Sequence, residues 1–187
     1  NVESHGRKTP ICEIELELKS GEPDALYDLA LDWARRFDCL PFDQSKAERG
    51  MRLACCAADA PVKPVQAGLD RAMRVEDGFA AICQACLTHF QANLPGVLDA
   101  DDIEYVHQAR VALRRLRAAL RLYRRVCVLP PELSAGLRAL AAALGPARDL
   151  DVLCSETLPA IAPHYDDTGG WQAGMATLAA HRAAARN

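Results

Sequence analysis

The most regular pattern of apolar residues along the chain lies between residues 106 and 126, and it has the period of a helix. Because an α-helix completes a turn every 3.6 residues, apolar positions spaced by three and four form one stripe. We therefore expect a continuous helix whose apolar stripe packs into a core. The stripe consists of Val106, Ala109, Leu113, Leu116, Leu120 and Tyr123.

The rest of the chain after residue 65 shows a similar helical period. We expect one helix over residues 65–94, ended by Pro95 and Gly96, and acidic residues at 99–102 that cap the next helix. A shorter helix is expected over 131–144, followed by a second one that begins at Gly145-Pro146, and an alanine-rich helix near the end. The short connections favour antiparallel neighbours in a bundle.

The first part of the chain has a different pattern. Apolar and charged residues alternate over residues 11–19, which predicts a half-buried strand. An amphipathic helix follows over 24–37, with Pro23 at a favourable first position. Residues 45–53 are expected to form a loop that leads into another strand. The fold prediction is therefore a mainly α helical bundle preceded by a small α+β segment.

Two prolines, Pro61 and Pro64, stand in a stretch without periodicity and mark a boundary. We therefore predict a first domain over residues 1–58, a linker over 59–64 and a helical domain over 65–187.

The composition adds three expectations. The net charge is −3, but arginines strongly outnumber acids between residues 105 and 150, so the local charge differs from the total. No apolar run approaches the length of a membrane span, and we expect a cytoplasmic protein. The eight cysteines lie mostly among alanines and leucines, and we expect them reduced and structural, including the Cys83-x-x-Cys86 pair.

A second stripe, made of basic residues, runs beside the apolar stripe of the 106–126 helix. Like charges at these spacings repel one another, so a bound polyanion would offset their cost. Arginine guanidinium groups suit phosphate oxygens, and the scarcity of aromatic residues argues against a single-stranded nucleic acid. The candidate residues are His107, Arg110, Arg114, Arg117, Arg121, Arg124 and Arg125.

The stretch from Val106 to Arg121, together with Gly145-Pro-Ala-Arg148-Asp149-Leu-Asp151, resembles the CHAD family. This resemblance implies an all-α domain of two related helical halves that binds inorganic polyphosphate on a basic surface, and this chain would supply about the first half. Arg148 joins the candidate phosphate ligands, because we expect it to open a helix, where amide groups favour anions. Asp149 and Asp151 are expected to orient the arginines of the basic stripe. The resemblance also suggests an association with polyphosphate granules.

Three carboxylates, Glu13, Glu15 and Glu17, share one face of the expected strand at about 7 Å spacing. Oxygen ligands of this kind suit Mg²⁺ or Mn²⁺. The segment from Cys12 to Gly21, the 24–37 helix and residues 45–53 resemble the C-terminal part of a CYTH domain, the triphosphate tunnel family. The resemblance implies a metal-dependent triphosphatase in which the three glutamates hold the metal. It assigns the triphosphate to Lys19, Lys46, Arg49 and Arg52.

The first ExExK strand of that family has no counterpart here, so we expect this segment alone to be inactive. Two alternatives to polyphosphate binding stay open. The arginine stripe could dock an acidic protein partner, or it could bind nucleic acid without specificity, although no recognition-helix turn or aromatic RNA platform is evident.

Overall fold

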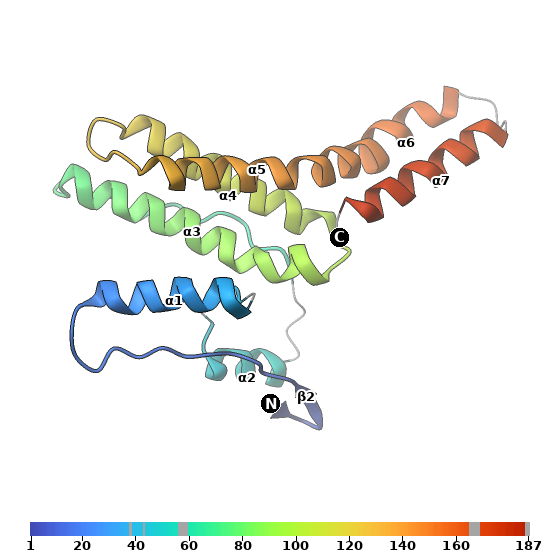
Figure 1. The fold of residues 1–187 in the computed structure, drawn as a ribbon. Helices are drawn as coiled ribbons and strands as arrows, with labels where there is room; N and C mark the ends of the chain where they lie inside the picture. The colour runs from blue at the N-terminus through green and yellow to red at the C-terminus, as the bar shows by residue number, and fades with distance from the viewer. Residues whose placement is uncertain (38, 43, 56–59, 165–168, 186–187) are drawn as a thin grey trace. The chain divides into compact units, whose positions relative to one another are not determined.

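The computed structural model describes the chain except for residues 38, 43, 56–59, 165–168 and 186–187 (Figure 1). It divides into two compact units, Asn1–Asp59 and Ala60–Asn187. Most of the regular structure is helical, and this confirms the predicted mainly α fold class. None of the helices within the described residues is long and apolar enough to cross a membrane.

Unit 1 begins with a short antiparallel hairpin of β1 (Val2–Ser4) and β2 (Arg7–Thr9). His5 and Gly6 connect the strands with positive φ angles of 48° and 76°, as in the two-residue turns that match the twist of paired strands. Helix α1 (Pro23–Phe37) follows and confirms the helix predicted there, with Pro23 as its first residue.

The strand predicted over residues 11–19 is wrong. This segment has no regular secondary structure, and its intended inner face is open to solvent, with Ile14 48% and Leu18 40% exposed. Alternation marks one apolar face, but a strand also needs a neighbour for its backbone hydrogen bonds. The two strands in the described part of the chain pair with each other. The segment thus has the sequence pattern of a strand without a partner strand.

The loop and strand predicted over residues 45–53 are also wrong, because helix α2 (Lys46–Ala54) lies there. Ser45 caps it: its Oγ accepts a hydrogen bond from the Glu48 N–H at 3.2 Å, and the Glu48 carboxylate accepts one from the Ser45 N–H at 2.8 Å. This reciprocal pair satisfies two backbone donors. The hydrogen bonds that the Ser45 N–H and the Ser45 hydroxyl donate to the Glu48 carboxylate lower the pKa of Glu48. The Ser-x-x-Glu spacing in the sequence therefore indicates the start of a helix at this position.

Unit 2 starts with an extended segment, residues 60–70, where the sequence predicted a linker and the start of a helix. The side chain of the buried Asn93 binds both backbone groups of Val62: Oδ1 accepts from N–H at 2.9 Å, and Nδ2 donates to the carbonyl at 3.0 Å. Arg115, which faces away from the basic stripe, donates to the Val65 carbonyl at 3.2 Å. The segment is therefore bound along the helices through its backbone.

Three long helices form the body of unit 2: α3 (Val75–Asp99), α4 (Ile103–Leu122) and α5 (Pro131–Val152). Each of these helices runs antiparallel to the one before it, and α4 contacts both α3 and α5 (Figure 1). Asp102 caps α4 by accepting from the Glu104 N–H at 2.9 Å, as the acidic cap predicted. The predicted apolar stripe of α4 supplies the core, with Val106, Ala109, Leu113 and Leu116 all buried.

Two helix ends predicted from proline are wrong. Helix α3 continues through Pro95 to Asp99, and α5 continues through Pro146 to Val152. Each proline removes one backbone hydrogen bond, and the packing of α3 against α4, and of α5 against α4 and α7, offsets this loss. At Gly96 the packing is tight, because a Cβ atom there would overlap the Tyr105 ring.

After α5 the chain widens into a π-helical turn, η1 (Leu153–Thr157), and continues through α6 (Leu158–Ile161) and the 3₁₀ turn η2 (Ala162–His164). Helix α7 (Gly169–Ala184) then packs back against α5 and η1 (Figure 1). Residues 165–168 lie outside the described part of the chain, and α7 corresponds to the expected alanine-rich helix.

Candidate anion-binding site

The basic stripe lies along α4, beside the buried apolar stripe. His107 and Arg110 are half-buried, whereas Arg114, Arg117 and Arg121 are exposed. At 1.5 Å rise per residue the helical part of the stripe spans about 21 Å. Arg124 and Arg125 lie in the turn after Leu122, where α4 ends, so they extend the stripe beyond the regular helix.

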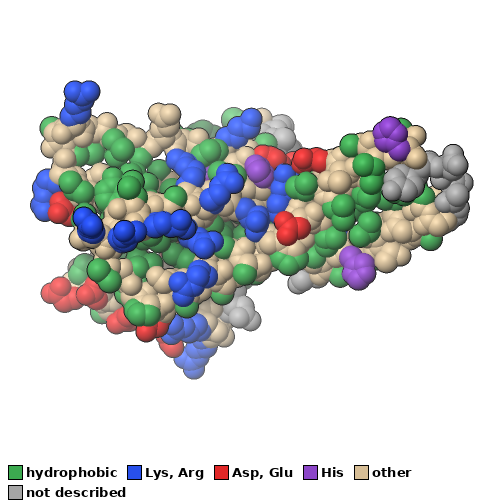
Figure 2. Space-filling view, turned by 90° about the horizontal axis from the view of Figure 1, so that it is seen from above, with side chains coloured by type: hydrophobic (Ala, Val, Ile, Leu, Met, Phe, Trp, Pro, Cys, Tyr) green, Lys and Arg blue, Asp and Glu red, His purple; other side chains and the backbone are tan. Residues whose placement is uncertain are grey.

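The three exposed arginines of α4 have no partner among the residues that the structure describes. Across the described residues, Arg114, Arg117 and Arg121 form neither an ion pair nor a hydrogen bond. Figure 2 shows Lys and Arg side chains gathered in a band across the face that includes α4 and α5, with few acidic side chains among them. The repulsion between these arginines is therefore not offset by carboxylates of the described chain.

The stripe forms the floor of an open groove in two overlapping parts. One part, of about 570 Å³, lies between α4 and α5, and the other, of about 790 Å³, lies toward the C-terminal end of α4. Arg114 and Arg117 line both parts, so the groove is continuous. The first part is lined by His107, Arg110, Arg138 and Arg148, and the second by Arg121, Arg124 and Arg125.

Arg110 has a defined position in this groove. Its guanidinium donates a hydrogen bond to the Ala141 carbonyl of α5 at 3.1 Å. Gly145 lies one turn further along α5, and a Cβ atom there would be 3.6 Å from the same guanidinium nitrogen. Arg110 therefore bridges α4 and α5 next to Pro146, and it offers its remaining donors to the groove.

Arg148 reaches the groove from the interior of α5, so the prediction that it opens a helix is wrong. The helix continues through Pro146, and the free amide groups of a helix start are therefore not available there. Its side chain is 17% exposed and donates to the Glu156 carboxylate at 3.3 Å. Its place among the groove residues comes from helix packing.

Arg138 is a groove residue that the sequence reasoning missed. It lies on α5 and lines the groove together with His107, Arg110 and Arg148. The sequence spacing indicates that Arg138 shares a helix face with Arg148. The residues Arg138, Ala141, Gly145 and Arg148 follow one another at intervals of three, four and three. The expected break at Gly145 concealed this continuity.

The two aspartates expected to orient the stripe have other surroundings. Asp149 is exposed. Asp151 is fully buried at 0% exposure and accepts a hydrogen bond from Arg182 Nε of α7 at 2.7 Å. The Asp151 carboxylate therefore pairs with an arginine that is not part of the basic stripe, and this ion pair joins α7 to α5.

The Cys83 and Cys86 pair lies on the core side of α3. Cys86 is 1% exposed, and burial raises the pKa of both thiols. A raised pKa keeps a thiol protonated and therefore poor as a nucleophile or metal ligand. This agrees with the predicted structural role. Cys12, Cys39, Cys55, Cys127 and Cys154 are also free thiols, and Cys56 lies outside the described residues.

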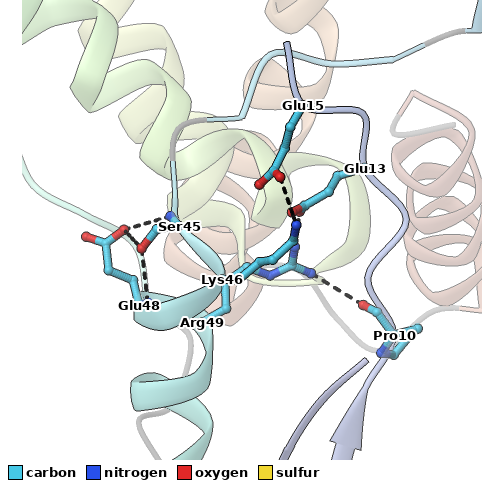
Figure 3. A network of polar contacts seen from close by, with 7 residues as sticks. All are labelled: Pro10, Glu13, Glu15, Ser45, Lys46, Glu48 and Arg49. Carbon is cyan, nitrogen blue, oxygen red and sulfur yellow. Dashed lines mark hydrogen bonds and ion pairs between the residues drawn. The ribbon is translucent and has the colours of Figure 1, made fainter. Parts of the chain in front are cut away.

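In unit 1 the predicted metal ligands and phosphate ligands bind each other (Figure 3). Lys46 Nζ lies 3.2 Å from Glu13 and 3.0 Å from Glu15, and these two carboxylates raise its pKa. Arg49 donates to Glu13 at 2.9 Å and to the Pro10 carbonyl at 3.3 Å. The cluster ties the segment before α1 to helix α2.

The third predicted metal ligand is elsewhere, since Glu17 pairs with Lys19 at 2.6 Å. Arg52 lies on α2, one turn after Arg49. Within the described residues no three His, Cys, Asp or Glu side chains come together as a metal site. As arranged, the three glutamates therefore do not fit the Mg²⁺ or Mn²⁺ ion that the sequence suggested.

Residues 81–187, more than half of the chain, match the CHAD domain family. The chain belongs to the CHAD family. The crystal structure of the CHAD domain from the plant Ricinus communis is similar at 37% identity and a TM-score of 0.62. That similarity covers 68% of this chain and 42% of the other. No curated protein matches the chain.

The CHAD match starts within α3 and includes each α4 and α5 residue that lines the groove. Unit 1 precedes the matched residues. This chain therefore spans less than half of the Ricinus communis CHAD domain structure.

Proposed function

We propose that the groove of α4 and α5 binds inorganic polyphosphate. The observation that carries this proposal is a set of arginines on the floor of an open groove that pair with none of the described residues: Arg114, Arg117 and Arg121. Folding keeps mutually repelling cations together there, and a bound polyanion would remove the repulsion. Such a site would place the protein with cellular polyphosphate stores.

The shape of the site favours a linear chain of phosphates. The arginines recur about every 5 Å along the α4 axis, and guanidinium groups can each bind two phosphate oxygens. Arg138 and Arg148 add cations from α5, which forms the opposite wall. A repeating anion can meet these residues in more than one register, so affinity should rise with chain length.

Nucleic acid is a weaker candidate, because no aromatic side chain is among the described residues that line the groove. Tyr123 is the aromatic residue nearest the stripe in sequence, and its ring packs against Phe79 with centroids 5.1 Å apart. Single-strand binders use exposed aromatic faces for stacking. The ring is therefore engaged in the packing of α3 against the end of α4.

Calorimetry with inorganic polyphosphate at two salt concentrations tests this function. Five or six phosphate contacts predict a log–log salt slope of about −4 to −5, and Arg114→Ala/Arg121→Ala should reduce its magnitude by about 2. The matched control is Arg35→Ala/Arg36→Ala, which removes the same charge from the exposed end of α1.

The control should bind like the wild type. Equal losses in both double variants would show a response to net charge alone and would refute the groove as the site. Equal affinity for duplex DNA would favour the nucleic-acid alternative. A folded wild type that binds neither polyanion would favour an acidic protein partner.

For unit 1 the second candidate is a triphosphate-binding surface that forms part of a CYTH-like domain. The convergence of Glu13 and Glu15 on Lys46 and Arg49 favours it, because the CYTH resemblance assigns these residues to one site. A triphosphate could bind the two cations in place of the carboxylates. Tripolyphosphate binding that survives Lys46→Ala/Arg49→Ala would reject this role.

A further inference from the structure

One of the arginines that line the groove, Arg148, pairs with an acidic residue. Glu156 Oε1 lies 3.3 Å from the NH2 nitrogen of Arg148. Among the arginines that line the groove in the described chain, Arg148 is the one paired with a carboxylate. Arg110 is held by a neutral carbonyl, and Arg114 and Arg117 contact no partner in the described ranges of the chain. The Glu156 carboxylate therefore engages a guanidinium nitrogen of Arg148 that a phosphate group in the groove would otherwise use.

An irregular helical turn carries Glu156. In a regular α-helix, residues eight apart are separated by about 12 Å of rise. Between Arg148 and Glu156 the helix widens into the π turn, in which the Leu158 N–H donates to the Leu153 carbonyl. The Ser155 hydroxyl also donates to the Asp151 carbonyl at 2.7 Å. Such turns are frequent at functional sites.

The two partners differ in their contact with water. The Arg148 side chain is 17% exposed, whereas the Glu156 side chain is 61% exposed. A carboxylate that leaves Arg148 would therefore be hydrated readily, but Arg148 would lose its anion. An incoming phosphate oxygen can supply that anion and bind the guanidinium with the same geometry.

We infer that Glu156 is an internal competitor for the Arg148 subsite, and that it lowers the affinity of the groove for polyphosphate. This inference rests on the proposed function. Glu156 occupies Arg148 in the free protein, and ligand binding exchanges the carboxylate for a phosphate. Ion pairs of this exposure contribute little, so removing the competitor should tighten polyphosphate binding about two- to fivefold.

The test compares dissociation constants for inorganic polyphosphate of one defined chain length at fixed salt. The variants are Glu156→Gln, Arg148→Gln and the double variant. Glu76→Gln is the matched control, because Glu76 also pairs with an arginine, Arg74, at 3.4 Å, and neither residue lines the groove. Circular dichroism should show equal helix content in all proteins.

Glu156→Gln should bind more tightly than the wild type, and Glu76→Gln should not. In the Arg148→Gln background the gain should disappear, because the competition acts through that guanidinium. A gain that persists in this background reflects long-range charge and overturns the inference. Unchanged affinity of Glu156→Gln, with binding still dependent on Arg114 and Arg121, overturns it while the proposed function stands. A folded wild type without polyphosphate binding refutes both.

Discussion

Removal of Arg182 should destabilise unit 2 more than neutralisation of its partner, Asp151. Arg182 Nε donates to Asp151 Oδ1 at 2.7 Å and joins α7 to α5. The Asp151 side chain is 0% exposed, whereas the Arg182 side chain is 32% exposed. Without Arg182 a buried carboxylate loses a charged partner, but without the carboxylate the guanidinium can still reach water. Removal of Arg182 should therefore lower the free energy of unfolding more than neutralisation of Asp151 does.

The magnitudes follow from the exposure of each group. Breaking a fully buried ion pair costs about 3–5 kcal/mol, and a hydrogen bond to a charged group contributes about 1.5–3 kcal/mol. Because the pair lies partly at the surface, we expect about 2–4 kcal/mol for Arg182→Ala. Asp151→Asn keeps an acceptor for Arg182 and should cost about 1–2 kcal/mol.

Urea unfolding measures both values. The chain has two tryptophans, and Trp33→Phe leaves Trp171 of α7 as a local reporter of α7 docking. Arg138→Ala is the control, because this exposed arginine of α5 should change the free energy of unfolding by less than about 0.5 kcal/mol. Equal effects of Arg182→Ala and Arg138→Ala would refute a stabilising ion pair, and a larger effect of Asp151→Asn would refute the reasoning from exposure.

Two further predictions concern the core of unit 2. Gly96→Ala should destabilise the protein by about 1–3 kcal/mol, because its methyl group would overlap the Tyr105 ring, whereas Gly136→Ala on open surface should stabilise it by about 0.4–1 kcal/mol. Thermal unfolding compares them, and equal shifts would contradict the close packing. Burial raises the pKa of Cys86 above 9.0, so its contribution to stability is present below that pH and declines as the pH rises through the folded pKa. Cys86→Ala should remove this decline, and exposed Cys12 should react with a thiol reagent at pH 8 before Cys86 does.

Only part of the candidate site could be predicted from the spacing of residues within one helix. The α4 stripe could be predicted because both its apolar and its basic periodicity lie within one helix, and Leu113 and Arg114 fall on the expected faces. Arg138 and Glu156 could not be placed from the α4 pattern, since Arg138 lines the groove from α5 and Glu156 reaches Arg148 from the π turn. Their roles depend on how α5 packs and where its π turn begins.

The sequence by itself determined the helical class, the acidic cap at Asp102, the apolar face of α4 and the arginines beside it. These features depend on side chains within a few turns of one helix, and helical geometry fixes their relative positions. Tertiary structure alone decided that α3 and α5 continue through Pro95 and Pro146, that residues 11–19 do not form a strand, and that Asp151 pairs with Arg182. Burial over a long interface can outweigh one lost hydrogen bond, and a strand forms only where another strand lies beside it.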